Sequence, residues 1–127
     1  MPIPALCFDQ VVKEFALGEG VVRALDGLTL EIPAGGFTAI VGRSGSGKST
    51  LLNLAAGIDI PSAGEVMVQG QPLSRLSDDA LTRLRREHVG VVYQFFHLLP
   101  TLDVRENVAL PLLLDGKRER DARERAD

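Results

Sequence analysis

The sequence predicts an α/β fold with an antiparallel β subdomain at its N-terminal end. Short apolar runs follow one another closely over the first 32 residues, as in strands joined by tight turns. Residues 42–49 (Gly-Arg-Ser-Gly-Ser-Gly-Lys-Ser) fit the pattern G-x-x-x-x-G-K-[ST]. An apolar, β-branched run at 37–41 precedes this loop, and a helical pattern follows it from Ser49 to Ala56. Strand, glycine-rich loop and helix in this order form the core of P-loop NTPases, so we predict such a core here.

The N-terminal subdomain is expected to contain three short strands. A glycine-containing loop at 16–20 separates the first two, and Asp26-Gly27 is a typical hairpin-turn dipeptide before the third. The third run alternates apolar and polar residues, as a half-buried strand does. The predicted strands are residues 6–15, 21–25 and 28–32.

Three elements are predicted between the helix at 49–56 and residue 93. A short strand at 65–68 comes first. A helix to about Glu87 follows, and Ser77 is a favourable N-cap for it. Residues 89–93 are apolar and β-branched, so we predict a second buried strand there, in addition to the one at 37–41.

The remaining residues combine an apolar segment with charged helices. The segment from Phe95 to Leu99 is unusually apolar for a position just after a strand end. A helix is expected from about Val104, with a kink or break near Pro111 because proline lacks the amide hydrogen. Residues 117–127 alternate in charge and predict a solvated helix face, with a contact surface as the alternative.

The residue types at 42–49 suit phosphate binding. Glycines permit positive φ angles, so that successive N–H groups can point into one concavity at a helix N-terminus. Lys48 supplies a mobile charge for the β- and γ-phosphates, and the Ser49 hydroxyl is a hard oxygen suited to Mg²⁺. The alternative is a glycine-rich turn with a solvated lysine. The predicted nucleotide-contacting residues of this segment are Gly42, Arg43, Ser44, Gly45, Ser46, Gly47, Lys48, Ser49 and Thr50.

Composition excludes several other classes of protein. The chain has 127 residues, of which 45% are hydrophobic and 24% charged, as in an ordinary globular domain. Its net charge of −3 provides no basic field, so we expect no nucleic-acid partner. The single Cys7 cannot form an internal disulfide and is expected to be a buried small hydrophobe in a reducing cytoplasm. No signal peptide and no transmembrane segment are predicted.

Several motifs occur together in this chain. They are Ser-Gly-Ser-Gly-Lys-Ser-Thr at 44–50, Ala-Gly at 56–57, Pro-Ser-Ala-Gly-Glu-Val at 61–66, Val-Gly-Val-Val-Tyr-Gln at 89–94 and Leu-Leu-Pro-Thr-Leu-Asp-Val-Arg-Glu-Asn-Val at 98–108. On these residues the chain resembles the N-terminal part of an ABC transporter ATP-binding subunit. The resemblance is closest to the branch that serves lipoprotein release and macrolide export, and it covers about residues 6–127.

The resemblance implies roles for individual residues. Phe15 would stack on the adenine of ATP, where the family more often has Tyr; the alternative is a core phenylalanine. Gln94 matches the Q-loop glutamine, whose amide would reach Mg²⁺ and the attacking water, so that Lys48 and Gln94 are the predicted catalytic residues. The segment Phe95–Leu99 would pack against a coupling helix of the ABC permease. His97 stands where the family often has Asn, and we expect a polar surface or interface role for it.

In the family a second half follows, with the LSGGQ signature, the Walker B strand and a switch histidine, and residues 1–127 contain none of them. Leu-Leu-Leu-Asp at 112–115 is the nearest imitation of Walker B, but Gly116 follows in place of a glutamate. We therefore expect a truncated, partial ABC-type nucleotide-binding domain with an uncovered sheet edge. The resemblance also implies a head-to-tail dimer in the full-length form, peripheral on the cytoplasmic face of the membrane.

Two interpretations stay open from the sequence. In the first, the chain is part of an ABC transporter ATPase that binds MgATP, and hydrolysis belongs to the complete relative. In the second, it is a non-catalytic interaction fragment that binds a permease or a complementary half without ATP turnover. A GTPase or small-molecule kinase is disfavoured, because no Asn-Lys-x-Asp motif occurs.

Overall fold

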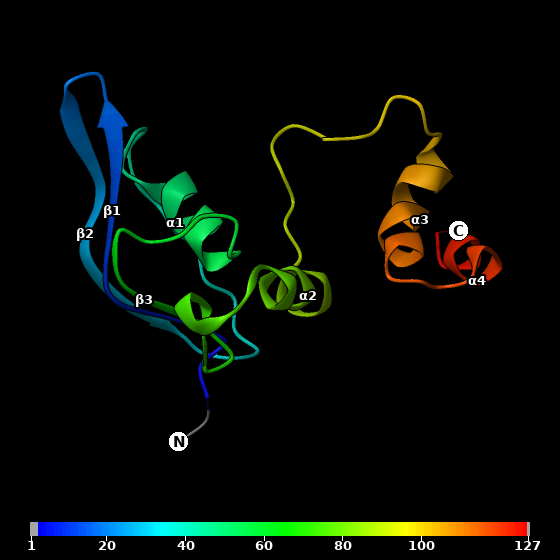
Figure 1. The fold of residues 1–127 in the computed structure, drawn as a ribbon, viewed down its shortest axis with the longest axis horizontal. Helices are drawn as coiled ribbons and strands as arrows, with labels where there is room; N and C mark the ends of the chain where they lie inside the picture. The colour runs from blue at the N-terminus through cyan, green and yellow to red at the C-terminus, as the bar shows by residue number, and fades with distance from the viewer. Residues whose placement is uncertain (1–2, 127) are drawn as a thin grey trace. The chain divides into compact units, whose positions relative to one another are not determined.

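The computed structural model describes residues 3–126, which divide into two compact units. The first unit extends to Gly90 and the second begins at Val91. The first contains all the strands and the glycine-rich loop, and the second contains two helices and the segment that leads into them (Figure 1).

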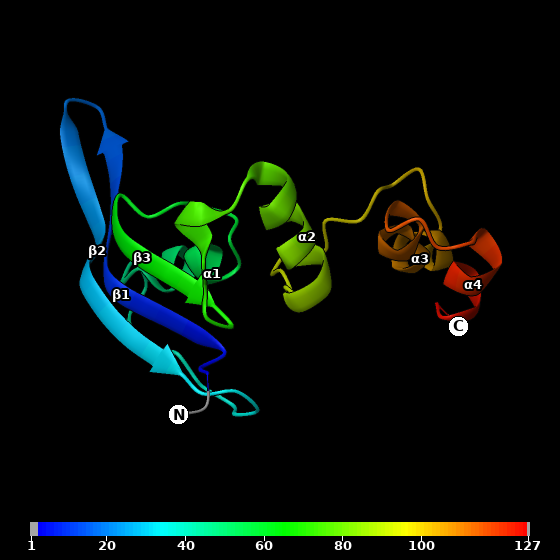
Figure 2. The same ribbon diagram turned by 60° about the horizontal axis from the view of Figure 1, so that its bottom comes forward.

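A four-stranded antiparallel sheet forms the framework of the first unit. Its strands are β1 (Leu6–Leu17), β2 (Gly20–Ile32), β3 (Ala63–Val68) and β4 (Gln71–Pro72), in the spatial order β2-β1-β3-β4 (Figure 2). The long strand β1 pairs with β2 on one side and with β3 on the other, so that Phe8 lies opposite both Leu30 and Val66. The predicted antiparallel subdomain is therefore confirmed.

The strand β2 corrects one prediction from the sequence. Asp26-Gly27 is not a turn, because residues 20–32 form one continuous strand against β1. The pairing shifts register between the Val11–Leu28 and Lys13–Leu25 pairs, and the irregularity accommodates Gly27 at φ 67°. The chain reverses at a tight turn after Leu17 instead, within the predicted loop. Pairing along the whole of β1 outweighs the local turn propensity of Asp-Gly.

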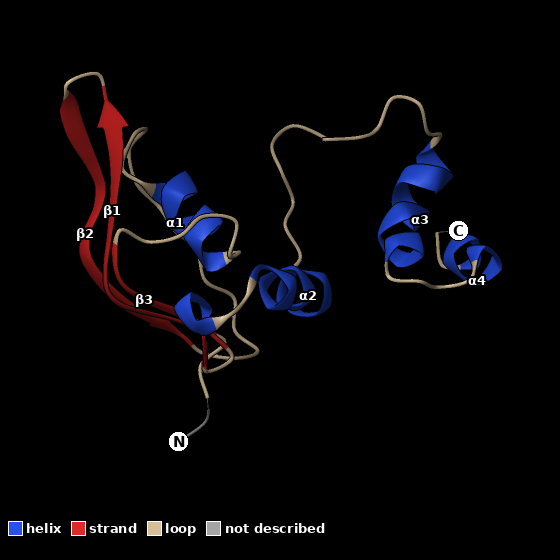
Figure 3. Cartoon of the chain, viewed as in Figure 1, coloured by secondary structure: helices blue, strands red, loops and turns tan. Residues whose placement is uncertain are grey.

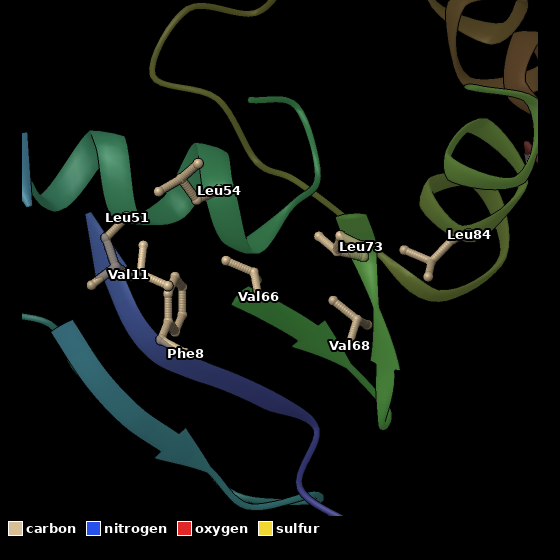
Figure 4. Close-up of a cluster of buried hydrophobic side chains, with 8 residues drawn as sticks. All are labelled: Phe8, Val11, Leu51, Leu54, Val66, Val68, Leu73 and Leu84. Carbon is tan, nitrogen blue, oxygen red and sulfur yellow. The ribbon is translucent and has the colours of Figure 1, made fainter. Parts of the chain in front are cut away.

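One helix covers the sheet and closes the core of the first unit. Helix α1 (Lys48–Ala55) packs Leu51 and Leu54 against the apolar side chains of β1 and β3 (Figure 4). The 3₁₀ turn η1 (Leu73–Arg75) and helix α2 (Asp78–His88) complete the cluster. Its buried members are Phe8, Val11, Leu51, Leu54, Val66, Val68, Leu73 and Leu84.

Helix α2 begins where the sequence predicts. Ser77 is its N-cap, and the Oγ atom accepts a hydrogen bond from the backbone N–H of Ala80 at 3.3 Å. Asp78 and Asp79 follow in the first turn, where acidic groups stabilise the helix dipole. Leu84 is the buried residue of the helix and joins the core, so the predicted apolar face is confirmed there.

The two predicted buried strands are wrong. Residues 37–41 and 89–93 are irregular in the structure (Figure 3). Phe37 is 97% exposed and Val92 is 100% exposed, although Ile40 and Val89 still pack against the core. A strand is stabilised by hydrogen bonds to a neighbouring strand, and neither segment is paired with a strand of the described sheet. Apolar, β-branched residues alone do not form a strand without that neighbour.

The second unit contains two packed helices. Helix α3 (Val104–Leu114) starts with a capping box, in which Asp103 and Glu106 each accept a hydrogen bond from the other's backbone N–H. Of the kink or break predicted near Pro111, the break is absent, since the helix continues to Leu114. The kink stays a prediction. Helix α4 (Glu119–Glu124) packs on α3 and is exposed except at Ala122, so the predicted solvated face is confirmed over these residues. The helix is shorter than the predicted segment 117–127.

Candidate functional site

The glycine-rich loop leads directly into helix α1. Gly47 is the N-cap residue of the helix, with φ 88°, and Gly45 has φ 78°. Both angles lie in the left-handed region, which glycine adopts without the steric penalty that a Cβ atom brings. The first turn of α1 presents backbone N–H groups that have no partner within the helix and carry its positive dipole end. The loop geometry is therefore suited to an anion.

Strand β2 lies against this loop. A Cβ atom at Gly47 would come within 2.5 Å of the Ala24 carbonyl oxygen and 3.2 Å of Leu25 Cδ2. The same atom built on Gly45 would meet nothing within 4 Å. Position 47 therefore requires glycine for two reasons, its backbone conformation and the close approach of β2, whereas position 45 requires it for the conformation alone.

The Lys48 side chain folds back over the loop. Its Nζ atom donates hydrogen bonds to the backbone oxygens of Gly42 at 2.9 Å and Arg43 at 2.6 Å, and to Ser46 Oγ at 3.3 Å. The three loop residues that these bonds reach are thus gathered around one ammonium group. This places a full positive charge at the concave side of the loop, beside the N-terminus of α1.

A pocket of about 620 Å³ joins the loop to the sheet. Phe15 and Ala24 contribute the side formed by β1 and β2. Loop and helix residues form the other side: Ser44, Gly45, Gly47, Lys48, Ser49 and Thr50. Phe15 is 42% exposed, so part of its ring faces solvent in place of the core. An aromatic ring and a cationic, N–H-rich loop around one pocket can hold a planar base and a phosphate chain together.

Most of the site residues predicted in the first unit meet at this pocket. Six of the nine loop and helix residues line it, and the other three, Gly42, Arg43 and Ser46, hold the Lys48 ammonium instead. Ser49 contributes the only hydroxyl that the sequence assigned to Mg²⁺. Among residues 3–126 no cluster of three or more His, Cys, Asp or Glu side chains could hold a metal ion by itself.

Gln94 and the segment Phe95–Leu99, which the sequence also predicts to be functional, lie in an exposed part of the second unit. Gln94 is exposed at a bend, and the apolar side chains of Phe95 and Phe96 after it are 73% and 88% exposed. The His97 ring contacts Tyr93 edge-on, with ring centroids 4.7 Å apart. The roles of Gln94 and of the segment Phe95–Leu99 remain predictions.

Sequence reasoning missed two charged residues beside Phe15. Lys13 Nζ lies 5.0 Å from the centre of the Phe15 ring and forms an ion pair with Asp59 Oδ1 at 2.7 Å. Burial acts to raise the pKa of the Asp59 carboxyl, but hydrogen bonds from Lys13 and from the Ile60 N–H, with the Lys13 charge, lower it overall. Lys13 precedes Phe15 by two residues, and residues two apart in a strand lie on the same face of the sheet. This spacing is the signal that could have identified Lys13 as a neighbour of Phe15. Ala24 approaches Gly47 through its backbone carbonyl oxygen, and the side-chain sequence gives no signal of such a backbone contact.

Comparisons with known proteins agree with this geometry. A family profile described as ABC transporter matches residues 25–127. The lipoprotein-releasing system ATP-binding protein LolD of Xylella fastidiosa (strain Temecula1) is 46% identical over 123 residues, 97% of this chain and 51% of the relative. The macrolide export ATP-binding/permease protein MacB of Burkholderia pseudomallei (strain K96243) is 47% identical over 123 residues, 97% of this chain and 19% of that protein.

Solved structures give the same result. The ATP-binding cassette MJ0796, in a dimeric post-hydrolysis state bound to ADP and Pi, superposes with a TM-score of 0.89 at 40% identity. That match covers 95% of this chain and 53% of the cassette. The chain thus spans about half the length of the LolD relatives and of this cassette. No helix within residues 3–126 is long and apolar enough to cross a membrane. With the family profile matching most of its length, the chain belongs to the ABC transporter family.

Proposed function

We propose that this chain binds MgATP as the N-terminal part of the nucleotide-binding domain of an ABC transporter ATP-binding subunit. The observation that carries the proposal is the pocket that joins the Phe15 ring to the glycine-rich loop. The ring would stack on the adenine, and the loop N–H groups and Lys48 would bind the phosphates. The relatives named for lipoprotein release and macrolide export suggest one of these transport processes for the complete protein.

Different residues would bind the phosphates and the metal ion of MgATP. Lys48 would exchange its bonds to the loop carbonyls for bonds to phosphate oxygens, since an ammonium group forms stronger hydrogen bonds with charged acceptors. The Ser49 hydroxyl would bind Mg²⁺, whose preference is for oxygen ligands. The metal would neutralise phosphate charge, and Gln94 would supply an amide to the metal and to the attacking water in the complete domain.

The proposed partner surface is the segment from Phe95 to Leu99. Its apolar side chains are exposed, and an exposed apolar patch of this kind is typical of a protein interface. We propose that it docks on the membrane permease, at the cytoplasmic face of the membrane, and that the complete protein works as a head-to-tail dimer. The cassette MJ0796 is dimeric in its solved structure, which supports the dimer.

The test is binding of MgATP to the purified chain, measured by photolabelling with 8-azido-ATP and by calorimetry. Lys48→Ala should weaken binding by about tenfold to a hundredfold, because one charge-assisted hydrogen bond to phosphate contributes about 1.5–3 kcal/mol. Lys117→Ala is the matched control, since Lys117 is exposed and lies in the second unit, outside the pocket lining. Equal binding by wild type and Lys48→Ala would contradict the proposal.

The metal role has a separate readout. Ser49→Ala should abolish the gain in ATP affinity that Mg²⁺ gives and leave binding in excess EDTA unchanged, because the hydroxyl contacts the metal in the proposed arrangement. Thr101→Ala is a matched control, because Thr101 is exposed in the second unit and is not among the residues that line the pocket. A gain in affinity with Mg²⁺ that is the same in Ser49→Ala as in wild type would remove Ser49 from the metal site.

A further inference from the structure

We propose that Lys13 is a positioning residue for the base-binding ring: its ammonium group, held by Asp59, fixes Phe15 against the pocket. The inference rests on the proposed function, since the ring acts on a base only if the pocket binds a nucleotide. It adds a residue that lies outside the phosphate-binding motif and outside the pocket lining. The Lys13–Asp59 ion pair also connects the base-binding ring to the segment that follows helix α1.

The ammonium of Lys13 is held by interactions of three kinds. It pairs with Asp59 Oδ1 at 2.7 Å, donates to the Ile60 carbonyl oxygen at 2.8 Å and lies 5.0 Å from the Phe15 ring centre. The Lys13 side chain is only 12% exposed. A lysine on a surface strand normally keeps many rotamers, so this degree of fixation is a built feature of the site.

The Phe15 ring is in contact with both the cation and the pocket. Phe15 lines the pocket, while Lys13 lies over the ring and is not among the lining residues. A cation over one face of an aromatic ring is attracted by the ring's negative π surface. The same attraction restrains the ring and draws charge from its other face, which favours stacking on a base.

Asp59 is the residue that holds the Lys13 ammonium in place. It lies just beyond the end of α1, and its carboxylate accepts hydrogen bonds from Lys13 and from the Ile60 N–H. The lowered pKa of the carboxyl keeps it ionised at neutral pH. Lys48 is the first residue of α1, and Asp59 follows the last residue of the helix. In the proposed arrangement, Lys48 binds the phosphates, and Asp59 acts through Lys13 and Phe15 on the base.

The charges around Lys13 leave Asp59 as its nearest partner. Glu14 is the next acidic residue on β1, but it pairs with Arg23 Nη2 at 2.8 Å. Removing Asp59 should therefore release the ammonium from the ring, while removing Glu14 should leave it in place. Glu14→Gln is the matched control for Asp59→Asn, because both replace an ion-paired carboxylate beside the same stretch of β1 with an amide.

The experiment compares two ligands, MgATP and magnesium tripolyphosphate, on the full chain. Lys13→Met should weaken ATP binding about two- to fivefold, the range of an exposed cation–π interaction, and leave tripolyphosphate binding unchanged. Lys13→Arg should restore much of the ATP affinity. In a Phe15→Leu background, Lys13→Met should have no further effect on ATP, because the ring through which it acts is gone.

The outcomes separate the two proposals. Wild-type protein that binds neither ligand would overturn the proposed function itself. Wild-type protein that binds ATP, with Lys13→Met binding it equally well, would overturn the role of Lys13 alone, and so would an equal loss for both ligands. If Lys13→Met does not fold, Asp59→Asn decides the question by the same comparison of ligands, with Glu14→Gln beside it.

Discussion

The side-chain amide of Asn107 pairs with the backbone of Leu99 in both directions. Its Oδ1 atom accepts a hydrogen bond from the Leu99 N–H at 2.8 Å, and its Nδ2 atom donates to the Leu99 carbonyl oxygen at 3.1 Å. The same Nδ2 atom lies 3.0 Å from the Leu102 oxygen and 2.9 Å from the Asp103 oxygen. One side chain of α3 thus closes the loop that joins the exposed apolar segment to the helix.

Asn107→Ala should loosen this loop without unfolding the chain. The substitution removes the acceptor of the Leu99 N–H and the donor to the Leu102 carbonyl, while the Leu99 and Asp103 carbonyls keep their backbone partners. The loss costs about 1–3 kcal/mol locally. Hydrogen exchange at the Leu99 amide should accelerate by about tenfold or more. Val108→Ala, an exposed neighbour on α3, is the control. Unchanged protection of Leu99 in Asn107→Ala would show that the loop is held by other contacts.

The two left-handed glycines of the phosphate loop should respond differently to alanine. Gly45→Ala should cost about 1–2 kcal/mol, the penalty of a left-handed L-residue, because its surroundings are open. Gly47→Ala should cost more, since its Cβ would also meet the Ala24 oxygen at 2.5 Å. Urea unfolding of both variants measures the difference. Equal midpoints would mean that β2 moves away from the loop at no cost.

The Lys13–Asp59 pair should make stability depend on acid pH. The pKa of Asp59 in the folded chain is lowered from its ordinary value of 3.8, in spite of burial, by the hydrogen bonds and charge of its partners. A lowered folded-state pKa contributes stability above 3.8, and this contribution is lost as the pH falls through the folded value below it. The urea midpoints of wild type and Asp59→Asn should therefore converge below pH 3.8. A constant gap across the range would refute the linkage.

Cys7 should react slowly with thiol reagents in the folded chain. The residue is 9% exposed in β1, and burial, followed by the charges of Glu31 and Asp9, raises its pKa above the ordinary 9.0. The thiolate is the reactive form, so both factors suppress alkylation. Labelling by iodoacetamide should be slow in buffer and fast in urea. Rapid labelling of the native chain would show that β1 opens readily.

The sequence predicted the elements whose signals are local. The loop pattern at 42–49, the Ser77 cap and the helix start at Val104 all depend on neighbours within a few residues, and the structure contains them. The strands predicted at 37–41 and 89–93 are absent because a strand depends on a partner elsewhere in space, which hydrophobicity along the chain does not reveal. Asp26-Gly27 was misjudged for the same reason, since pairing with β1 keeps it inside β2.

The candidate site shows a similar division. The motif identified the loop residues, while Phe15 came from the family resemblance, and the structure places them around one pocket. Lys13 and Asp59 are 46 residues apart in the sequence, so their ion pair could not be predicted from local sequence patterns. The contact between Gly47 and Ala24 involves the backbone, and a pattern of side chains does not predict such a contact.

The turn between β1 and β2 lies a few residues along the strands from Phe15, which lines the pocket. Phe15 pairs with Val22, and only the Ala16–Val21 and Leu17–Gly20 pairs separate it from the end of the hairpin. The turn residues are exposed, and a Cβ at Gly18 would meet nothing within 4 Å. An environment-sensitive dye attached at Glu19 would therefore sit a few residues from the ring while leaving the core untouched. The hairpin tip is therefore a suitable attachment point for a fluorescent sensor of pocket occupancy in this chain.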